Sequence, residues 1–203
     1  VVERDEVASL VRHDLPLPRC AGYENFWDRF CFDYGTVLLY GDSNAYGGLI
    51  RPTTFDYEAR AWNHVSLWDA HHDSGYRGTL EEFKARDTLS CEDWMLKHHL
   101  LGSHLEVIYP NWRDGTGEAG PLIPLDRRVD DGTDPERTYH AVYLCRSGAW
   151  VPPWCDDQFQ DLLDAWGDNA EEVPGNSWTQ PRTDVVEPAT HLVAKMAELW
   201  PQQ

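Results

Sequence analysis

The run Asp-Ala-His-His-Asp at residues 69–73 combines carboxylates and imidazoles at a spacing suited to metal binding. It directly follows a short apolar stretch at residues 65–68. In an extended segment, Asp69, His71 and Asp73 share one face because side chains alternate across a strand. Carboxylate oxygens and a neutral imidazole suit a divalent cation such as Zn, Mn or Fe. The spacing predicts one divalent metal ion on these three ligands; the alternative is an acidic, His-containing surface loop.

Two further residues are candidates for proton transfer beside such a metal. His72 points to the opposite face of an extended segment, which favours a supporting or exposed position. Asp42 follows a second apolar run at residues 37–40. It can serve as a fourth oxygen ligand, as a general base, or as a turn former. We therefore predict Asp42 and His72 as the catalytic acid–base groups.

The bulk composition excludes several classes of protein. The chain has 203 residues, a formal net charge of −18 and a pI near 4.7, which argues against nucleic acid as a partner. No apolar run approaches the length of a membrane span, so we expect no membrane partner. The five cysteines include no Cys-x-x-Cys pair, which favours a reducing, cytoplasmic location over a disulfide framework. A small-molecule ligand or substrate remains, and the oligomeric state stays open.

The elements that must position these groups are short strands alternating with helices. Strands are predicted near residues 37–40, 65–69, 105–109 and 141–145, because each range is an apolar run stopped by polar, Gly or Pro residues. Apolar residues at helical spacing predict helices in three places, which are 90–102, 159–167 and 192–200. Such alternation is typical of parallel β-α-β units. We predict one three-layer α/β/α domain over residues 1–203 with a mainly parallel sheet.

Other parts of the chain carry no periodicity. We expect an N-terminal arm at residues 1–23 and long loops at 113–137 and 167–187. Because parallel strands end at one edge of a sheet, Asp42, the three metal ligands and Arg146 should converge on one crevice.

Three more groups of residues have ordinary structural explanations. Cys145 is expected to be a small buried side chain. Three histidines are expected at the surface or at element boundaries, namely His98, His99 and His104. Four tryptophans in Pro- and Gly-rich stretches could wall an aromatic pocket or cover the sheet, namely Trp112, Trp150, Trp154 and Trp178.

The strand followed by Asp-Ala-His-x-Asp resembles the signature of the arginase/agmatinase (ureohydrolase) superfamily and of the related histone deacetylases. It is more closely similar to the uncharacterised arginase-like family UPF0489, in which a Ser-containing helix and a strand closing in Pro-x-Trp follow. The corresponding pieces here are residues 89–94 and 107–112. The resemblance covers residues 34–154 and implies an arginase-like fold, with Asp69, His71 and Asp73 at metal positions.

The resemblance is incomplete at two places. Ser43 stands where a ureohydrolase has a ligand histidine, and the late Ser-x-Asp-x-Asp strand has no counterpart. A complete two-manganese site is therefore not expected. Two functions follow from what remains. One is a metal-dependent hydrolase of a C–N bond of the amide or guanidine type. The other is a non-catalytic arginase-like domain that binds a ligand or a protein through the strand-end crevice.

Overall fold

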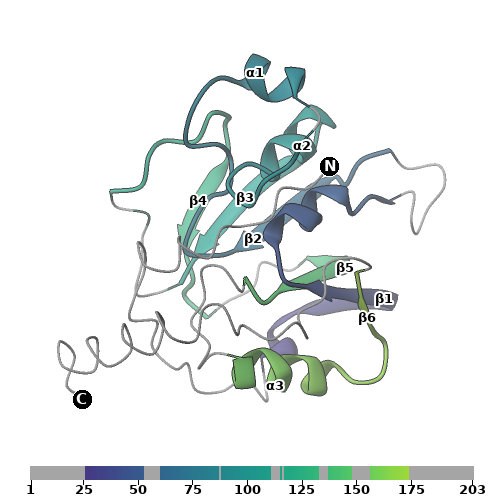
Figure 1. Cartoon of the computed structure of the whole chain (residues 1–203). Helices are drawn as coiled ribbons and strands as arrows, with labels where there is room; N and C mark the ends of the chain where they lie inside the picture. Colours follow the sequence, from purple (N-terminus) through teal and green to yellow (C-terminus); the bar gives the residue numbers. More distant parts are fainter. Residues whose placement is uncertain are drawn as a thin grey trace, which may run out of the picture. The chain divides into compact units, whose positions relative to one another are not determined.

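The computed structural model describes residues 26–52, 60–86, 88–110, 115, 117–132, 137–147 and 156–173. These residues belong to two compact units. Within the described part, the first unit comprises residues between 44 and 132, and the second comprises residues 26–43 and 137–173. Each unit is an α/β structure built on a three-stranded parallel sheet (Figure 1). The prediction of a single domain stays a prediction.

The sheet of the first unit contains β2 (His64–Trp68), β3 (His104–Tyr109) and β4 (Asp126–Val129), with β3 in the middle. Both pairs of neighbouring strands are parallel, with Leu67 beside Val107 and Ile108 beside Arg128. Because the strands are parallel, the residues that follow β2 and β3 lie at the same edge of this sheet.

The helix α2 (Met95–Leu100) lies on one face of this sheet, and α1 (Leu80–Ala85), at the top of Figure 1, contributes Phe83 to the same apolar core. Alternate residues of β3 enter the apolar core on that face, where Val107 and Met95 have no exposed surface. A short 3-10 helix, η4 (Asn44–Leu49), contacts α2. Burial of these apolar side chains is the main source of stability of the unit.

Local sequence signals explain where the helices begin and end. Thr79 and Glu82 form a reciprocal capping box at the start of α1. The region before α2 is a turn in which Asp93 accepts hydrogen bonds from the backbone and side chain of Ser90. Gly102 follows α2 with φ +91°, a conformation that other residues rarely adopt.

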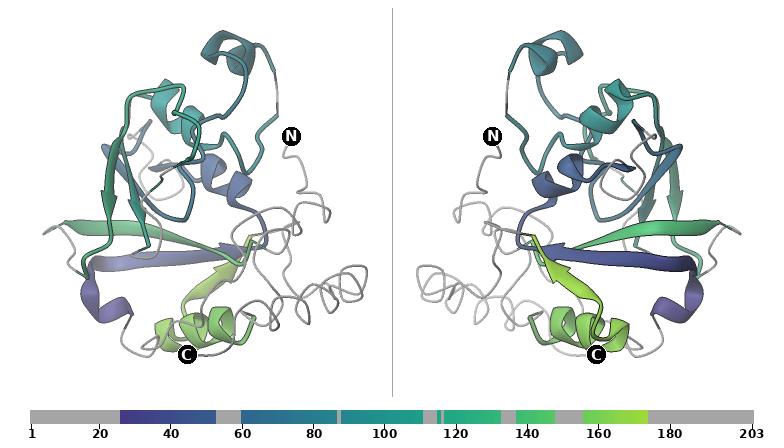
Figure 2. Two further views of the ribbon diagram at one scale, coloured as in Figure 1. Left: turned by 90° about the vertical axis from the view of Figure 1, so that its left-hand side faces the viewer. Right: turned by 90° about the vertical axis from the view of Figure 1, so that its right-hand side faces the viewer.

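The second unit contains β1 (Cys31–Gly41) between β5 (Thr138–Cys145) and β6 (Ala170–Glu172), again all parallel. The helix α3 (Asp156–Trp166) packs Phe159 and Leu163 against Leu38 of β1 (Figure 2). Before β1, the 3-10 helix η3 (Trp27–Arg29) adds Trp27, whose ring contacts Trp166 at the end of α3.

All four predicted strands are present and parallel, and α2 and α3 confirm two of the predicted helices. The prediction that the four strands share one sheet is wrong for the described residues, because hydrogen bonds join β1 to β5 and β2 to β3 in separate sheets. The predicted loops at 113–137 and 167–187 contain β4 and β6. Both strands are short and polar, so they carry no apolar run. The N-terminal arm and the helix at 192–200 lie outside the described residues.

Candidate functional site

The chain leaves the extended conformation as soon as β2 ends at Trp68. The carboxylate of Asp69 accepts a hydrogen bond from the backbone N–H of His71 at 2.9 Å, which closes a tight turn. Asp73 then adopts a left-handed conformation with φ +46°, rare for a residue other than glycine. The alternation of a strand therefore does not extend to residues 69–73.

The Asp73 side chain is buried and held by two N–H donors. Its Oδ2 accepts hydrogen bonds from the Trp94 indole at 2.8 Å and from the Asn44 amide at 3.0 Å. Burial, followed by the negative charge of Asp69, raises the pKa of the Asp73 carboxyl well above its usual range, and the two donors act in the opposite direction. The surroundings of the Asp73 carboxyl thus disfavour its charged form.

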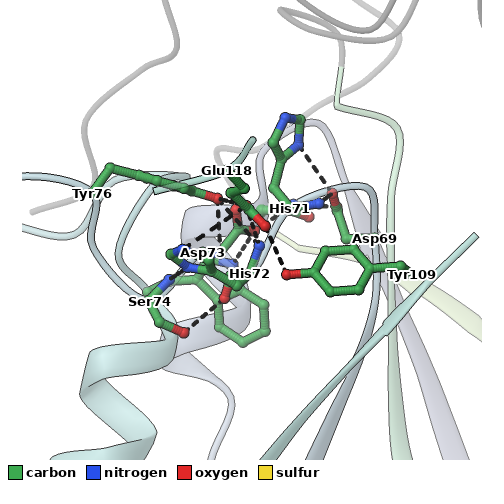
Figure 3. Close-up of polar contacts among 10 residues, drawn as sticks. Asp69, His71, His72, Asp73, Ser74, Tyr76, Tyr109 and Glu118 are labelled. Atoms are coloured by element: carbon green, nitrogen blue, oxygen red, sulfur yellow. Dashed lines mark hydrogen bonds and ion pairs between the residues drawn. The ribbon is translucent and has the colours of Figure 1, made fainter. Parts of the chain in front are cut away.

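Asp69 and His71 lie at the more accessible edge of the cluster. The side chains are 24% and 26% exposed, and His71 Nδ1 is 3.3 Å from Asp69 Oδ1. Figure 3 shows the His71 ring directed away from the buried residues below it. Asp69 Oδ2 accepts a hydrogen bond from the same Asn44 amide that contacts Asp73, also at 3.0 Å. One amide nitrogen therefore touches both carboxylates.

The predicted metal site does not form in this arrangement. Among the described residues, no group of three or more His, Cys, Asp and Glu side chains could hold a metal ion. The physical reason is the turn after β2: Asp73 rotates toward Asn44 and Trp94, and His71 stays beside Asp69. Asp69, His71 and Asp73 thus do not fit a divalent cation as three convergent ligands, and no metal-assisted step follows from them.

His72 is fully buried, which excludes the exposed alternative of the position predicted for it. Its Nε2 lies 2.7 Å from the carbonyl oxygen of Ala119 and therefore carries the proton, while Nδ1 accepts from the backbone N–H of Ser74. Burial lowers the pKa of the imidazole, so this neutral tautomer is favoured. Both ring nitrogens thus hold the loop in place. The predicted proton-carrying role of His72 stays a prediction.

Glu118 connects this loop to β3 through a buried network that Figure 3 shows. Its Oε1 accepts from the Tyr76 hydroxyl at 2.6 Å and from the backbone N–H of His72 at 2.9 Å, and its Oε2 accepts from the Tyr109 hydroxyl at 2.6 Å. The pKa of each phenol is raised, first by burial; the hydrogen bond to Glu118 raises it further. Both phenols are therefore neutral donors to one carboxylate.

Asp42 and Arg146 meet at the carboxyl ends of β1 and β5 in the second unit. Arg146 Nε is 3.2 Å from Asp42 Oδ1 and 3.5 Å from Asp156 Oδ1, and the arginine side chain is only 4% exposed. Cys145 is half-buried, and its Sγ accepts a hydrogen bond from the backbone N–H of Ser147. The predicted convergence of this group with the β2 cluster, and the catalytic role of Asp42, stay predictions.

Several residues of the β2 cluster were missed from the sequence. Asn44 follows a strand in an ordinary turn sequence, Trp94 reads as one apolar residue of a helix, and Glu118 lies in a stretch without periodicity. Only the position of Tyr109, at the end of a predicted strand, gave a signal. The four loop tryptophans discussed above lie outside the described residues.

In the part of the chain that the structure describes, no helix has the length and apolarity needed to cross a membrane. Comparison of the sequence and the structure with protein-family models, with curated proteins and with solved structures finds no match.

Proposed function

We propose that this chain is a binding domain whose β2 cluster recognises a small ligand that carries a cationic nitrogen group, such as a guanidinium or an ammonium. The observation that carries the proposal is the shared donor of Asp69 and Asp73: both carboxylates contact one neutral amide nitrogen, at 3.0 Å each. Among the described residues, neither carboxylate forms an ion pair with a lysine or an arginine. Within the described part, the negative charge of the pair is thus not offset by a lysine or an arginine.

The accessible edge of the cluster sets the geometry of recognition. Asp73 is buried, whereas Asp69 and His71 retain about a quarter of their side-chain surface. A planar cation can therefore contact Asp69 from the solvent side while Asp73 acts through its charge at short range. Charge-assisted hydrogen bonds of this kind are shorter and stronger than neutral ones. The buried network of His72 and Glu118 keeps the loop in a fixed conformation, which reduces the entropy lost on binding.

Binding of such a cation is expected to release protons. The raised pKa of Asp73 falls when a positive charge lies nearby, because the charged form of the carboxyl is then favoured. Affinity should consequently rise with pH through the pKa of Asp73 in the free protein and level off above it. Calorimetric titration in two buffers of different ionisation enthalpy measures this proton release directly.

A matched pair of ligands tests the proposal. Arginine and citrulline have nearly the same shape, but only arginine carries a guanidinium. Isothermal titration should show arginine binding at least tenfold more tightly than citrulline. Asp69→Asn should remove that preference. Asp126→Asn is the control, because Asp126 also pairs with a histidine, His104, at 3.0 Å but is 71% exposed on β4. Equal binding of the two ligands, or an unchanged preference in Asp69→Asn, contradicts the proposal.

A second candidate is hydrolysis of a C–N bond in the same cationic ligand, favoured by the pairing of His71 with Asp69. A carboxylate that contacts one ring nitrogen orients the imidazole and stabilises its protonated form, which suits it to general acid–base work. Release of ammonia or urea from guanidino compounds is the assay. His71→Gln should abolish the release if hydrolysis occurs, and Asp126→Asn should leave it unchanged. If the ligand binds and no product is released, binding is the function that remains.

The family is part of the same proposal. Support comes from the parallel pair β2 and β3, from the polar cluster directly after β2, and from the quoted resemblance of residues 65–73 to the arginase-like signature. The three-layer arrangement typical of that fold belongs to the proposal. A cytoplasmic location stays a prediction.

A further inference from the structure

Asn44 lies between the two carboxylates of the β2 cluster, at the place where a bridging cation would be expected. Its Nδ2 is 3.0 Å from Asp69 Oδ2 and 3.0 Å from Asp73 Oδ2. The orientation of the amide follows from chemistry: rotation by 180° would place the amide oxygen against two carboxylate oxygens, whereas the NH₂ group offers one hydrogen to each.

The position of this amide is fixed by the packing of η4 on α2. The carbonyl oxygen of Gly47 lies 3.0 Å from Nε2 of His98, which is buried although the sequence predicts a position at the surface or at an element boundary. A Cβ added at Gly47 or Gly48 would lie 3.1–3.3 Å from atoms of Trp94, so no larger residue fits there without a shift. Trp94 in turn donates to Asp73. The same tryptophan thus supports both Asn44 and its acceptor.

We propose that Asn44 is the specificity-determining residue of this cluster and that its amide replaces a metal ion. Two N–H groups from one nitrogen satisfy both carboxylates without adding charge. A divalent cation that bridged Asp69 and Asp73 would have to displace a buried amide. That displacement would leave the amide without its two acceptors. The native chain therefore excludes divalent cations from the position between Asp69 and Asp73. The neighbouring side chains, two carboxylates and an imidazole, are nevertheless of the types that bind such cations. This inference does not rest on the proposed ligand.

One substitution should reverse the selectivity. Asn44→Asp puts a third carboxylate between Asp69 and Asp73 and removes the N–H donors. Three oxygens that repel one another then favour a cation, and His71 beside Asp69 is an adjacent nitrogen ligand. Asn44→Asp should melt at a lower temperature than the native chain without metal, and Mn²⁺ should restore several degrees. The native chain should shift by less than about one degree under the same conditions.

The experiment combines thermal unfolding with calorimetric titration of Mn²⁺ into the purified full-length chain. We expect Asn44→Asp to bind one ion at least a hundredfold more tightly than the native chain. The double variant Asn44→Asp with Asp69→Asn should lose that gain. Asn44→Ala, which removes the amide without adding charge, should gain at least tenfold and serves as the second variant if Asn44→Asp folds poorly.

Two results would overturn the inference. The first is stoichiometric Mn²⁺ binding by the native chain that Asp69→Asn abolishes. The second is the absence of any gain in metal affinity in both Asn44→Asp and Asn44→Ala, with circular dichroism showing that at least one of them is folded. Failure of arginine to bind, in contrast, would remove the proposed function and leave the metal result untouched.

Discussion

Replacement of Glu118 by glutamine tests whether the buried network holds the loop after β2. The two carboxylate oxygens of Glu118 accept different numbers of hydrogen bonds. Oε1 accepts from the Tyr76 hydroxyl and from the backbone N–H of His72, whereas among the described residues Oε2 accepts from the Tyr109 hydroxyl. Glutamine in the same rotamer keeps an acceptor oxygen at the Oε1 position, because two donors converge there. Its NH₂ group then faces the Tyr109 hydroxyl, which must turn its proton elsewhere and accept from the amide instead of donating to it.

The expected cost follows from this count of hydrogen bonds. Glu118→Gln loses the charge-assisted hydrogen bond that Tyr109 donates, and such bonds contribute about 1.5–3 kcal/mol each. A neutral hydrogen bond from the amide to the hydroxyl offsets part of this loss. The other two bonds become neutral and weaken. We expect the free energy of unfolding to fall by about 2–4 kcal/mol. In a Tyr109→Phe background the charge-assisted bond is already absent, so the same change should cost at least ~1 kcal/mol less. In a Tyr76→Phe background the cost should change little.

Urea unfolding followed by tryptophan fluorescence measures these values, since the chain has ten tryptophans. Glu81→Gln is the matched control, because Glu81 is 81% exposed and pairs with Lys84 on the surface of α1. That change should cost no more than about 0.5 kcal/mol. The reasoning is refuted if Glu118→Gln costs no more than this control, or if its coupling to Tyr76 exceeds its coupling to Tyr109.

Three further perturbations test other parts of the first unit. Gly115→Ala should lower the free energy of unfolding by about 1–3 kcal/mol more than Gly117→Ala. Both glycines have positive φ, but of these two only Gly115 has an aromatic ring of β3 within 3.0 Å of the added Cβ. Urea midpoints of the two variants give the difference. His98 is buried with a pKa lowered from 6.5, first by burial, so below pH 6.5 the unfolded chain binds a proton that the folded chain does not. Between pH 6.5 and 5, the free energy of unfolding of the native chain should fall more steeply than that of His98→Gln, by up to about 1.4 kcal/mol per pH unit. The control is His140→Gln, a change at an exposed histidine, which should keep the slope of the native chain. Asp73 has a raised pKa, so its ionisation disfavours the folded chain as pH rises. Asp73→Asn should therefore be more stable than the native chain at pH 8, and unfolding at pH 4 and pH 8 should show the advantage shrinking in acid.

The elements with an apolar period could be predicted from the sequence. The runs at residues 37–40, 65–69, 105–109 and 141–145 all lie in strands, because each is apolar enough to be a core element whichever sheet it joins. Which strands are neighbours depends on pairing over long distances, and the sequence gives no local signal for it. The polar strand β4 could not be predicted for the same reason. Its residues have no apolar pattern of their own, and they form a strand because they pair with β3.

The residue types at 69–73 indicated a polar cluster at a strand end but not how its side chains would be arranged. The motif at residues 69–73 does contain buried and charged groups at the end of a parallel strand, as its residue types indicated. The prediction placed the three ligands on one face of an extended segment and had them converge where the strand end curls. The chain does leave the extended conformation, but the left-handed turn at Asp73 directs its carboxylate to Asn44 and Trp94. An aspartate can adopt this conformation at modest cost, so the residue types alone allow both geometries.

Partners from distant segments decide between a metal site and a hydrogen-bonded network. Asn44 lies 25 residues before Asp69, and Glu118 lies 46 residues after His72. The neutral amide of Asn44 gives each carboxylate an N–H donor, and both ring nitrogens of the buried His72 have backbone partners. An Asp-x-His-x-Asp motif at a strand end therefore indicates a concentration of charge, and the residue inserted between its carboxylates determines what satisfies that charge. In this chain the inserted residue is Asn44, which makes the identity of that one side chain a sharper indicator of metal use than the motif itself.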